Sequence, residues 1–256
     1  MSVINNINNA NTLIVGANRG IGFGFVSKLL ENQEYGKIYA TYRDRNSASE
    51  LIAFAEKYPQ RLICLSMDVT DEQQITEGIK FISESTDKLH LVVNCVGLLH
   101  DGKLQPEKSL RQLNSENLLR YFQVNSISSA LLAKHLLPLF RHDSQSIFAC
   151  ISAKIGSIGD NRLGGWYGYR ASKAALNMFM RTVAIEYGRK SPNTIVVTLH
   201  PGTTDTRLSE PFQRNVPPEK LFSVERTVNQ LFAVINNLGK EDSGEFFSWD
   251  GSRLPW

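Results

Sequence analysis

Strand-like and helix-like segments alternate along almost the whole chain of 256 residues. Short apolar runs, such as Leu-Val-Val at 91–93 and Ile-Val-Val at 195–197, are typical of strands that are covered on both faces. Stretches with apolar residues at helical spacing lie between these runs. The alternation indicates βαβ units, and it predicts a single doubly wound α/β domain with a mostly parallel sheet of about seven strands flanked by helices.

The same patterns give the expected bounds of each element. We expect strands over residues 12–16, 37–43, 61–69, 89–97, 146–152, 194–200 and 245–249. We expect helices over residues 21–30, 48–58, 72–84, 115–140, 167–188 and 224–238. The segment 115–140 is either one long helix or two abutting ones.

Length and the lack of a linker predict one domain over residues 11–256, preceded by a frayed, Asn-rich tail at 1–10. The Pro-containing segment near 203–224 is long for a connection between a strand and a helix. It is either a lid that orders over a ligand, with Phe212 and Leu221 against an apolar pocket, or ordinary surface packing.

The charge pattern argues against two classes of partner. Net charge is +3, and Lys and Arg are scattered among Asp and Glu, so we expect neither a nucleic-acid surface nor a polybasic membrane patch. No apolar run approaches about 18 residues, and the start of the chain lacks the basic and apolar regions of a signal peptide. We therefore expect a cytoplasmic protein. Cys64, Cys95 and Cys150 lie in apolar strand-like runs without metal-ligand spacing, so we expect packing thiols and no metal site.

A glycine-rich turn separates the first strand from the first helix, where a doubly wound sheet binds a dinucleotide pyrophosphate. Glycines permit a tight turn and a close approach of backbone to phosphate, and the start of the helix supplies free N–H donors. The spacing is Gly-x-x-x-Gly-x-Gly rather than the commoner Gly-x-Gly-x-x-Gly. The expected contacts are Gly16, Asn18, Arg19, Gly20, Ile21 and Gly22.

The end of the second strand predicts which dinucleotide binds. A carboxylate there would bind the 2′-hydroxyl of the adenosine ribose in NAD, and a cation would accept the 2′-phosphate of NADP. Arg43, helped by Arg19, favours NADP(H) over NAD(H). The alternative is that Arg43 is a solvated charge and that Asp44 binds the ribose.

Tyr169 and Lys173 lie four residues apart in the segment expected to be a helix. Positions i and i+4 share a helix face, so we expect the ammonium of Lys173 beside the phenol of Tyr169. A nearby positive charge would lower the pKa of the phenol from its ordinary value of about 10. The pair is therefore a candidate acid/base device that exchanges protons near neutral pH.

With further motifs in a fixed order, these features make the chain resemble the short-chain dehydrogenase/reductase family over essentially its full length. The further motifs are Asp68-Val69 after the third strand, Asn94-Cys95-Val96-Gly97 after the fourth, Asn125 in the long helix, and Pro201-Gly202-Thr203-Thr204-Asp205-Thr206 after the sixth. The resemblance implies a Rossmann fold, an NAD(P)-dependent oxidoreductase and a homodimer or homotetramer. The segments 164–169 and 249–256 look like the branch that contains the C-factor group and sniffer-type carbonyl reductases.

The resemblance also implies roles for single residues. Asp68 and Val69 would hold the adenine, Asn94 and Gly97 would lie against the cofactor, and Lys173 would also bind the nicotinamide ribose beside Tyr169. Asn125 would help to hold a water that links the lysine to a proton relay. The cofactor contacts implied after the sixth strand are Pro201, Gly202, the backbone of Thr204 and the hydroxyl of Thr206.

One position departs from the family pattern. Members normally have a serine three residues before a glycine after the fifth strand, where its hydroxyl orients the substrate carbonyl beside the tyrosine. Counting back from Gly156 puts Ala153 in this position. Either the turn aims the neighbouring Ser152 at the substrate, or Ser157 substitutes, or the protein works without this hydroxyl.

We therefore expect an enzyme that reduces an aldehyde or ketone with NADPH, with Tyr169 as the general acid/base and a small molecule as its substrate. The alternative is an NADP(H)-binding signalling or regulatory protein of C-factor type with weak or vestigial catalysis. Ala153 motivates this alternative.

Overall fold

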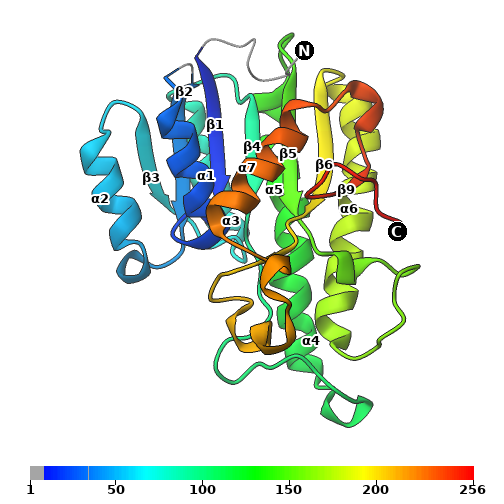
Figure 1. The fold of residues 1–256 in the computed structure, drawn as a ribbon. Helices are drawn as coiled ribbons and strands as arrows, with labels where there is room; N and C mark the ends of the chain where they lie inside the picture. The colour runs from blue at the N-terminus through cyan, green and yellow to red at the C-terminus, as the bar shows by residue number, and fades with distance from the viewer. Residues whose placement is uncertain (1–8, 34) are drawn as a thin grey trace.

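A parallel sheet of seven strands forms the centre of the computed structural model, which describes residues 9–33 and 35–256 (Figure 1). The strand order is β3-β2-β1-β4-β5-β6-β9, and all six neighbouring pairs are parallel. The strands are β1 (Ala10–Val15), β2 (Tyr35–Tyr42), β3 (Leu62–Ser66), β4 (Leu91–Asn94), β5 (Ser146–Ile151), β6 (Thr194–His200) and β9 (Phe246–Ser248). The predicted single doubly wound domain with a parallel sheet is confirmed.

Helices cover both faces of the sheet, as its apolar strands require. Two separate cores result, one between the sheet and α1, α2 and α7, the other between the sheet and α3, α5 and α6. The helices are α1 (Gly20–Glu31), α2 (Ser49–Lys57), α3 (Glu72–Ser83), α4 (Ser115–Phe122), α5 (Ser128–Phe140), α6 (Tyr167–Lys190) and α7 (Val224–Asn236).

The strand order reverses between β1 and β4. After β1 the chain builds β2 and β3 on one side, then crosses back and places β4 on the other side of β1. In open α/β sheets the crevice outside the carboxyl ends of the strands at such a reversal is where ligands bind. The loops that follow β1 and β4 both begin at this crevice.

Two expected bounds at this end of the sheet were too long. β3 ends at Ser66 rather than at 69, and β4 ends at Asn94 rather than at 97. In both places the strand pairing ends early, and the chain continues as a loop at the carboxyl end of the sheet. At the other end of β1, Ala10 is fully buried in the strand, so the predicted tail at 1–10 is wrong for this residue. Residues 1–8 lie outside the described residues.

The segment predicted as one long helix or two abutting ones is two helices joined by a π-helical turn, Gln123–Ile127. The backbone N–H of Ser128 reaches the carbonyl of Gln123 rather than that of Val124. The carbonyl oxygen of Val124, which therefore lacks its usual helical partner, accepts a hydrogen bond from the hydroxyl of Ser128 at 2.7 Å. A π-turn inside a helix often marks a functional site, and this one carries Asn125.

The predicted lid segment contains short β7 (Thr203–Thr204) and β8 (Leu221–Phe222), which pair in parallel, and two 3-10 turns between them. In Figure 1 this orange segment lies below the carboxyl ends of the strands, near the loop that follows β4.

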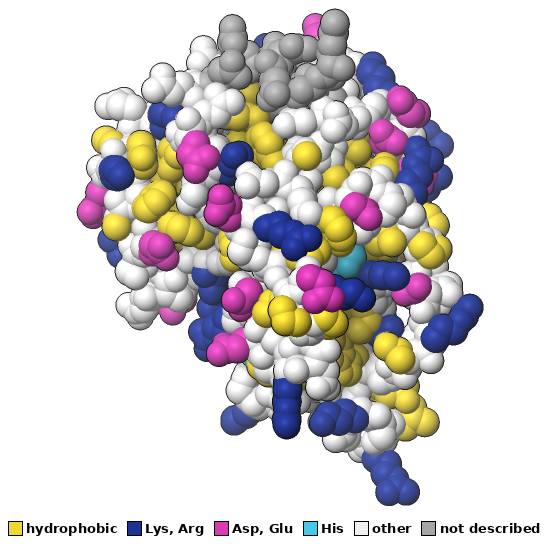
Figure 2. All heavy atoms as spheres, in the orientation of Figure 1, with side chains coloured by type: hydrophobic (Ala, Val, Ile, Leu, Met, Phe, Trp, Pro, Cys, Tyr) yellow, Lys and Arg dark blue, Asp and Glu magenta, His cyan; other side chains and the backbone are white. Residues whose placement is uncertain are grey.

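Within the described residues, no helix is long and apolar enough to cross a bilayer. On the face drawn in Figure 2, Lys and Arg side chains are interspersed with Asp and Glu over most of the surface. Charge of mixed sign does not create the strong single-sign field that steers polyanions.

Candidate active site

The glycine turn is built for close approach at the start of α1. Gly16 and Gly20 have φ of 76° and 54°, in the left-handed region that favours glycine. A Cβ on Gly22 would collide with the carbonyl oxygen of Gly16, so the turn packs against its own helix. Arg19, at the N-cap of α1, makes no side-chain cap. The first N–H groups of α1 are therefore available to an anion, which fits a dinucleotide pyrophosphate.

Positive side chains gather beside this turn. Burial lowers the pKa of Arg19, and the charges of Arg207 and Arg43 lower it further, which places three guanidinium groups near one another. The side-chain amide of Asn18 donates to the hydroxyl and carbonyl oxygens of Ser47, at 3.1 and 3.2 Å, and so ties the turn to the loop after β2. Arg43 is exposed at the end of β2.

The residues expected around the adenine and the sheet centre have defined partners. The carboxylate of Asp68 accepts from the backbone N–H and hydroxyl of Thr70, at 2.9 and 2.8 Å, and shapes the loop after β3 in which Val69 is buried. The amide of Asn94 donates to Ser129 at 2.9 Å, and its oxygen accepts from the backbone N–H of Val96 at 3.1 Å.

Tyr169 and Lys173 lie on one face of α6, as their spacing predicts. The Lys173 Nζ is 5.9 Å from the centre of the Tyr169 ring and donates to the carbonyl oxygen of Ile151 at 2.9 Å. Both side chains are buried, with exposed fractions of 7% for Tyr169 and 2% for Lys173. The carbonyl at the end of β5 thus holds the ammonium in place.

Burial changes the expected pKa values. Desolvation raises the pKa of Tyr169 above its ordinary value, so the expectation that Lys173 lowers it is wrong for this structure. Desolvation lowers the pKa of Lys173 to about 8. The physical reason is that both charged forms lose water on burial, which raises the pKa of the phenol and lowers that of the ammonium.

Asn125 and Gly97 lie beside this pair. The Asn125 oxygen accepts from the backbone N–H of Leu98 at 2.7 Å, and its amide donates to the Leu98 carbonyl at 2.9 Å and to Ser172 at 3.0 Å. A Cβ on Gly97 would lie 3.7 Å from the Lys173 Nζ and 4.0 Å from the Asn125 oxygen. The fold therefore brings residues from the loop after β4, the π-turn and α6 to one place.

The segment after β6 closes this place from the other side. A Cβ on Gly20 would lie 3.3 Å from the Thr206 side chain, so Thr206 faces the glycine turn. The Thr204 hydroxyl pairs with that of Thr227 on α7 at 2.9 Å. The side chain of Thr204 is therefore engaged within the protein. Pro201 is buried, and Gly202, with φ of 73°, packs against the Phe222 ring.

Ser152, the first alternative for the missing hydroxyl, has a partner within the protein. Its hydroxyl donates to the side-chain oxygen of Asn177 at 2.7 Å. Asn177 follows Tyr169 by eight residues in α6, or about 12 Å along the helix axis at 1.5 Å per residue. It is Ala153 that packs in the apolar cluster of Tyr169. The hydroxyl of Ser157, the second alternative, accepts from the backbone N–H of Asp160 at 3.1 Å.

Apolar and aromatic side chains surround Tyr169. Trp166 and Tyr121 each place their ring 6.3 Å from that of Tyr169, and Phe212 of the predicted lid lies 4.8 Å from the Trp166 ring. His100, after β4, contacts the Phe212 ring at 5.9 Å and pairs through Nε2 with the carbonyl oxygen of Arg207 at 3.1 Å. The residues 203–224 therefore pack onto the candidate site rather than away from it.

The sequence model of the short chain dehydrogenases matches residues 10–217 of this chain. The chain belongs to the short-chain dehydrogenase family.

Solved structures of this family share the whole fold. The NADPH-bound carbonyl reductase from chicken fatty liver superposes with a TM-score of 0.87 at 29% identity, covering 98% of this chain and 95% of that one. The carbonyl reductase Sniffer of Drosophila melanogaster gives 0.84 at 27% identity, covering 97% and 99%. Among curated relatives, the C-signal protein of Myxococcus xanthus is 30% identical over 148 residues, which are 58% of this chain and 84% of the relative. The chain is thus an oxidoreductase of the carbonyl reductase and sniffer-like branch.

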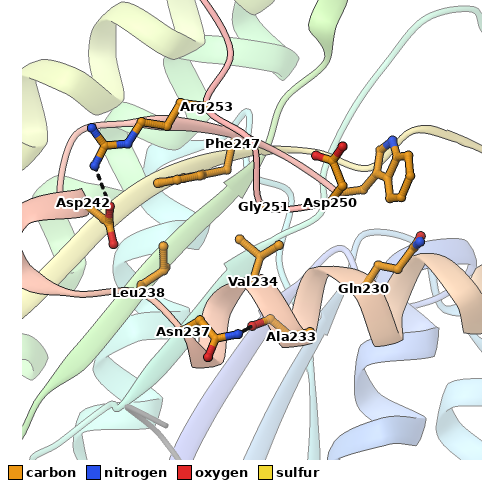
Figure 3. Close-up of a pocket in the computed structure, with 11 residues that line it drawn as sticks. Gln230, Ala233, Val234, Asn237, Leu238, Asp242, Phe247, Asp250, Gly251 and Arg253 are labelled. Atoms are coloured by element: carbon orange, nitrogen blue, oxygen red, sulfur yellow. Dashed lines mark hydrogen bonds and ion pairs between the residues drawn. The ribbon is translucent and has the colours of Figure 1, made fainter. Parts of the chain in front are cut away.

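A pocket of about 460 Å³ lies elsewhere in this short-chain dehydrogenase, between α7 and the segment that follows β9 (Figure 3). Val234, Leu238 and Phe247 form its apolar wall, and the ion pair of Arg253 with Asp242 lies at one end at 2.8 Å. None of the predicted site residues lines this pocket. This pocket is therefore separate from the place where Tyr169, Lys173 and Asn125 meet.

Sequence reasoning missed several residues of the site. Arg207 follows the Thr206 motif directly, and a search for cations around the glycine turn would have found it. Tyr121 and Glu107 have no such signal, because they approach Tyr169 only through tertiary contacts.

Proposed function

We propose that this short-chain dehydrogenase reduces an aldehyde or ketone with NADPH, with Tyr169 as the proton donor. The observation that carries the proposal is the meeting of Tyr169, Lys173 and Asn125 beside Gly97, at the strand ends where this fold binds dinucleotides. NADPH binding by the chicken carbonyl reductase supports the choice of cofactor.

The residues present fit the cofactor. The glycine turn and the start of α1 would hold the pyrophosphate, and Arg43 and Arg19 would hold the 2′-phosphate. Asp68 and Val69 would border the adenine, and Asn94, Gly97 and the segment 201–206 would border the nicotinamide half. When bound, NADPH supplies the hydride that goes to the carbonyl carbon.

The side chains of the chain handle the proton. As the carbonyl oxygen gains negative charge, the Tyr169 hydroxyl donates its proton to it, and an alcohol results. The raised pKa of Tyr169 keeps the phenol protonated at neutral pH, which suits a donor in the direction of reduction. Lys173, with a pKa of about 8, is mostly charged at pH 7 and stabilises the phenolate left behind. Asn125 would hold the water through which the proton is restored.

The apolar cluster suggests the kind of substrate. Trp166, Tyr121 and Phe212 would form the walls, and the residues 203–224 would act as a lid that excludes water. A carbonyl compound with an apolar or aryl substituent fits these walls.

Replacement of Tyr169 tests the proton donor. We expect Tyr169→Phe to lower kcat by about 100-fold or more, because general acid catalysis contributes at least this much. The measurement is the loss of NADPH absorbance with a panel of aldehydes and ketones. Tyr167→Phe is the matched control, since Tyr167 lies in the same helix turn but is 36% exposed. Turnover of Tyr169→Phe near that of the wild type would remove Tyr169 from the mechanism.

Replacement of Arg43 tests the preference for NADP(H). We expect Arg43→Gln to raise the KM for NADPH about tenfold or more, since a charge-assisted bond to phosphate contributes about 1.5–3 kcal/mol. The KM for NADH, which lacks the 2′-phosphate, should change little. An equal rise for both cofactors would contradict the assignment.

A signalling or regulatory role is the second candidate, favoured by Ala153 in the place of the usual serine and by the similarity to the C-signal protein. On this hypothesis the protein binds NADPH tightly but turns over no member of the carbonyl panel. Ala153→Ser separates the two. A rise of about tenfold in kcat/KM, worth about 1.4 kcal/mol, would indicate a tuned enzyme. Tight NADPH binding with no turnover in either form would favour the second candidate.

A further inference from the structure

Glu107 is a buried carboxylate to which the proposed mechanism gives no role. It is in the loop between β4 and α4, and only 2% of it is exposed. A buried charge normally needs a partner that compensates for its lost water. Within the part of the chain that the structure describes, the carboxylate is bonded to a backbone N–H and not to a cation. Its Oε2 accepts from the backbone N–H of Gly168 at 3.1 Å, across 61 positions of sequence.

Gly168 lies at the start of the helix that carries Tyr169, and this helix has no cap of its own. Trp166, at the N-cap position, is in the left-handed region with φ of 51° and makes no side-chain cap. The first turn of α6 contains no acidic residue. The first N–H groups of a helix lack partners within the helix and favour a negative charge nearby. Glu107 supplies a carboxylate oxygen to this helix start from a distant loop.

Glu107 holds the helix start at a second point through its backbone. Its carbonyl oxygen accepts from the N–H of Trp166 at 2.5 Å. Trp166 is a non-glycine residue with positive φ, which costs about 1–3 kcal/mol and persists only where surrounding contacts enforce it. The two bonds of Glu107 lie on either side of Tyr167 and fix the path of the chain into α6.

The packing around Gly168 leaves little freedom. A Cβ at this position would collide with the Tyr121 ring and would lie 2.9 Å from the Oε1 of Glu107. Tyr121 in turn contacts Tyr169, the next residue, with ring centres 6.3 Å apart. The start of α6 is thus clamped between the carboxylate of Glu107 and the ring of Tyr121.

The second carboxylate oxygen of Glu107 indicates that this residue has a role other than stabilising the fold. Oε1 is buried and has no hydrogen-bond partner within the described part of the chain. An unsatisfied buried acceptor costs about 1–3 kcal/mol, so a neutral apolar residue here would avoid a penalty. Positions that keep such a cost are typically functional.

We propose that Glu107 is a positioning residue for the reaction: its carboxylate caps α6 at Gly168 and so sets the place of the Tyr169 hydroxyl relative to the substrate. This inference rests on the proposed function for its kinetic part only. A small displacement of a reacting group is costly in catalysis, so loss of the cap should lower kcat rather than weaken binding.

The test compares three variants by kinetics and by amide hydrogen exchange. We expect Glu107→Ala to lower kcat about tenfold or more, while KM for the carbonyl and for NADPH stay within about twofold. Amides of residues 166–172 should exchange faster, and those of α7 should not change. Glu107→Gln keeps an acceptor for the Gly168 N–H and should retain most of kcat, and Glu107→Asp, shorter by one methylene, should fall between. If Glu107→Ala does not fold, the Asp and Gln variants carry the comparison.

The matched control is Asp71→Ala, which removes another carboxylate that caps a helix. Asp71 accepts from the N–H groups of Gln73 and Gln74 at the start of α3. This control should lose stability but keep kcat at saturating NADPH. Unchanged exchange at 166–172 in Glu107→Ala would overturn the cap, and faster exchange with unchanged kcat would overturn the positioning role. If the wild type reduces no carbonyl, the proposed function fails, and hydrogen exchange alone decides whether Glu107 caps the helix.

Discussion

Lys173 carries an ammonium group into a site with almost no access to water. Burial lowers its pKa from 10.5 to about 8, so the folded protein holds this proton less tightly than the unfolded chain does. Between these two values the unfolded state binds the proton and the native state does not, and stability then rises with pH. Below pH 8 both states are protonated, and the native state bears the full cost of the buried charge.

This linkage predicts the pH dependence of stability. The free energy of unfolding of the wild type should rise by about 3 kcal/mol between pH 7 and pH 11 relative to that of Lys173→Met, which has no such proton. Urea unfolding of both proteins across this range measures the difference. A constant difference would mean that Lys173 titrates normally. The cost at pH 7 is the stability that the protein gives up for a charge beside Tyr169.

At the scale of elements, the π-turn between α4 and α5 acts as a clamp that links the loop after β4 to α6 through the side chain of Asn125. Asn125 makes three hydrogen bonds from this turn, two to the backbone of Leu98 and one to Ser172. The turn thereby holds the loop after β4 against α6. Ser128, whose hydroxyl donates to the carbonyl oxygen of Val124, stabilises the turn locally.

Removal of this clamp should destabilise the protein as well as the site. We expect Asn125→Ala to lower the free energy of unfolding by about 2–4 kcal/mol, since the three hydrogen bonds of this buried side chain are lost at about 1 kcal/mol each and backbone groups are left without partners. Gln123→Ala, in the same turn but exposed, should change it by no more than about 0.5 kcal/mol. Urea unfolding measures both variants. Equal changes in the free energy of unfolding would show that the hydrogen bonds of Asn125 do not stabilise the protein.

At the scale of the whole molecule, the segment after β9 covers an open edge of the sheet. β9 is the last strand in the order, and an uncovered edge strand invites pairing with another chain. Residues 249–256 return along it: Leu254 donates to the Phe246 carbonyl at 2.8 Å, and the Trp256 ring stacks on that of Phe246 at 5.8 Å. The Trp256 carbonyl also accepts from the N–H of Gly159, in the loop that leads to α6.

Deletion of residues 252–256 should therefore expose the β9 edge. We expect a lower urea midpoint and a species of larger size in gel filtration that grows with protein concentration. Trp256→Ala, which removes the ring but keeps the backbone pairing, should lose about 0.5–1.5 kcal/mol without the larger species. If the deletion variant keeps the stability and the size of the wild type, the segment does not protect the β9 edge from pairing with another chain.

Much of this architecture follows from local sequence. The alternation of apolar runs and helical spacing predicted the parallel sheet, because each pattern reports the periodic burial of one element. Motifs in the sequence also located the main site residues, which are the glycine turn, Tyr169, Lys173, Asn125 and Thr206. The motifs are far apart along the chain, and the fold brings them together at the ends of the strands. The predicted strand ends were wrong mainly where a strand runs into a loop, at Ser66 and Asn94. The hydrophobic pattern there does not distinguish a hydrogen-bonded strand from an extended loop.

The sequence by itself thus determined the doubly wound fold and the residues that meet at its crevice. Only the tertiary structure decided how these groups behave: Ser152 turns to Asn177, Tyr169 holds its proton, Lys173 holds its own less tightly, and Glu107 reaches Gly168. The physical reason is range. Secondary structure follows from spacing over a few residues, whereas hydroxyl direction, desolvation and a cap from 61 residues away depend on which distant segments exclude water from one another.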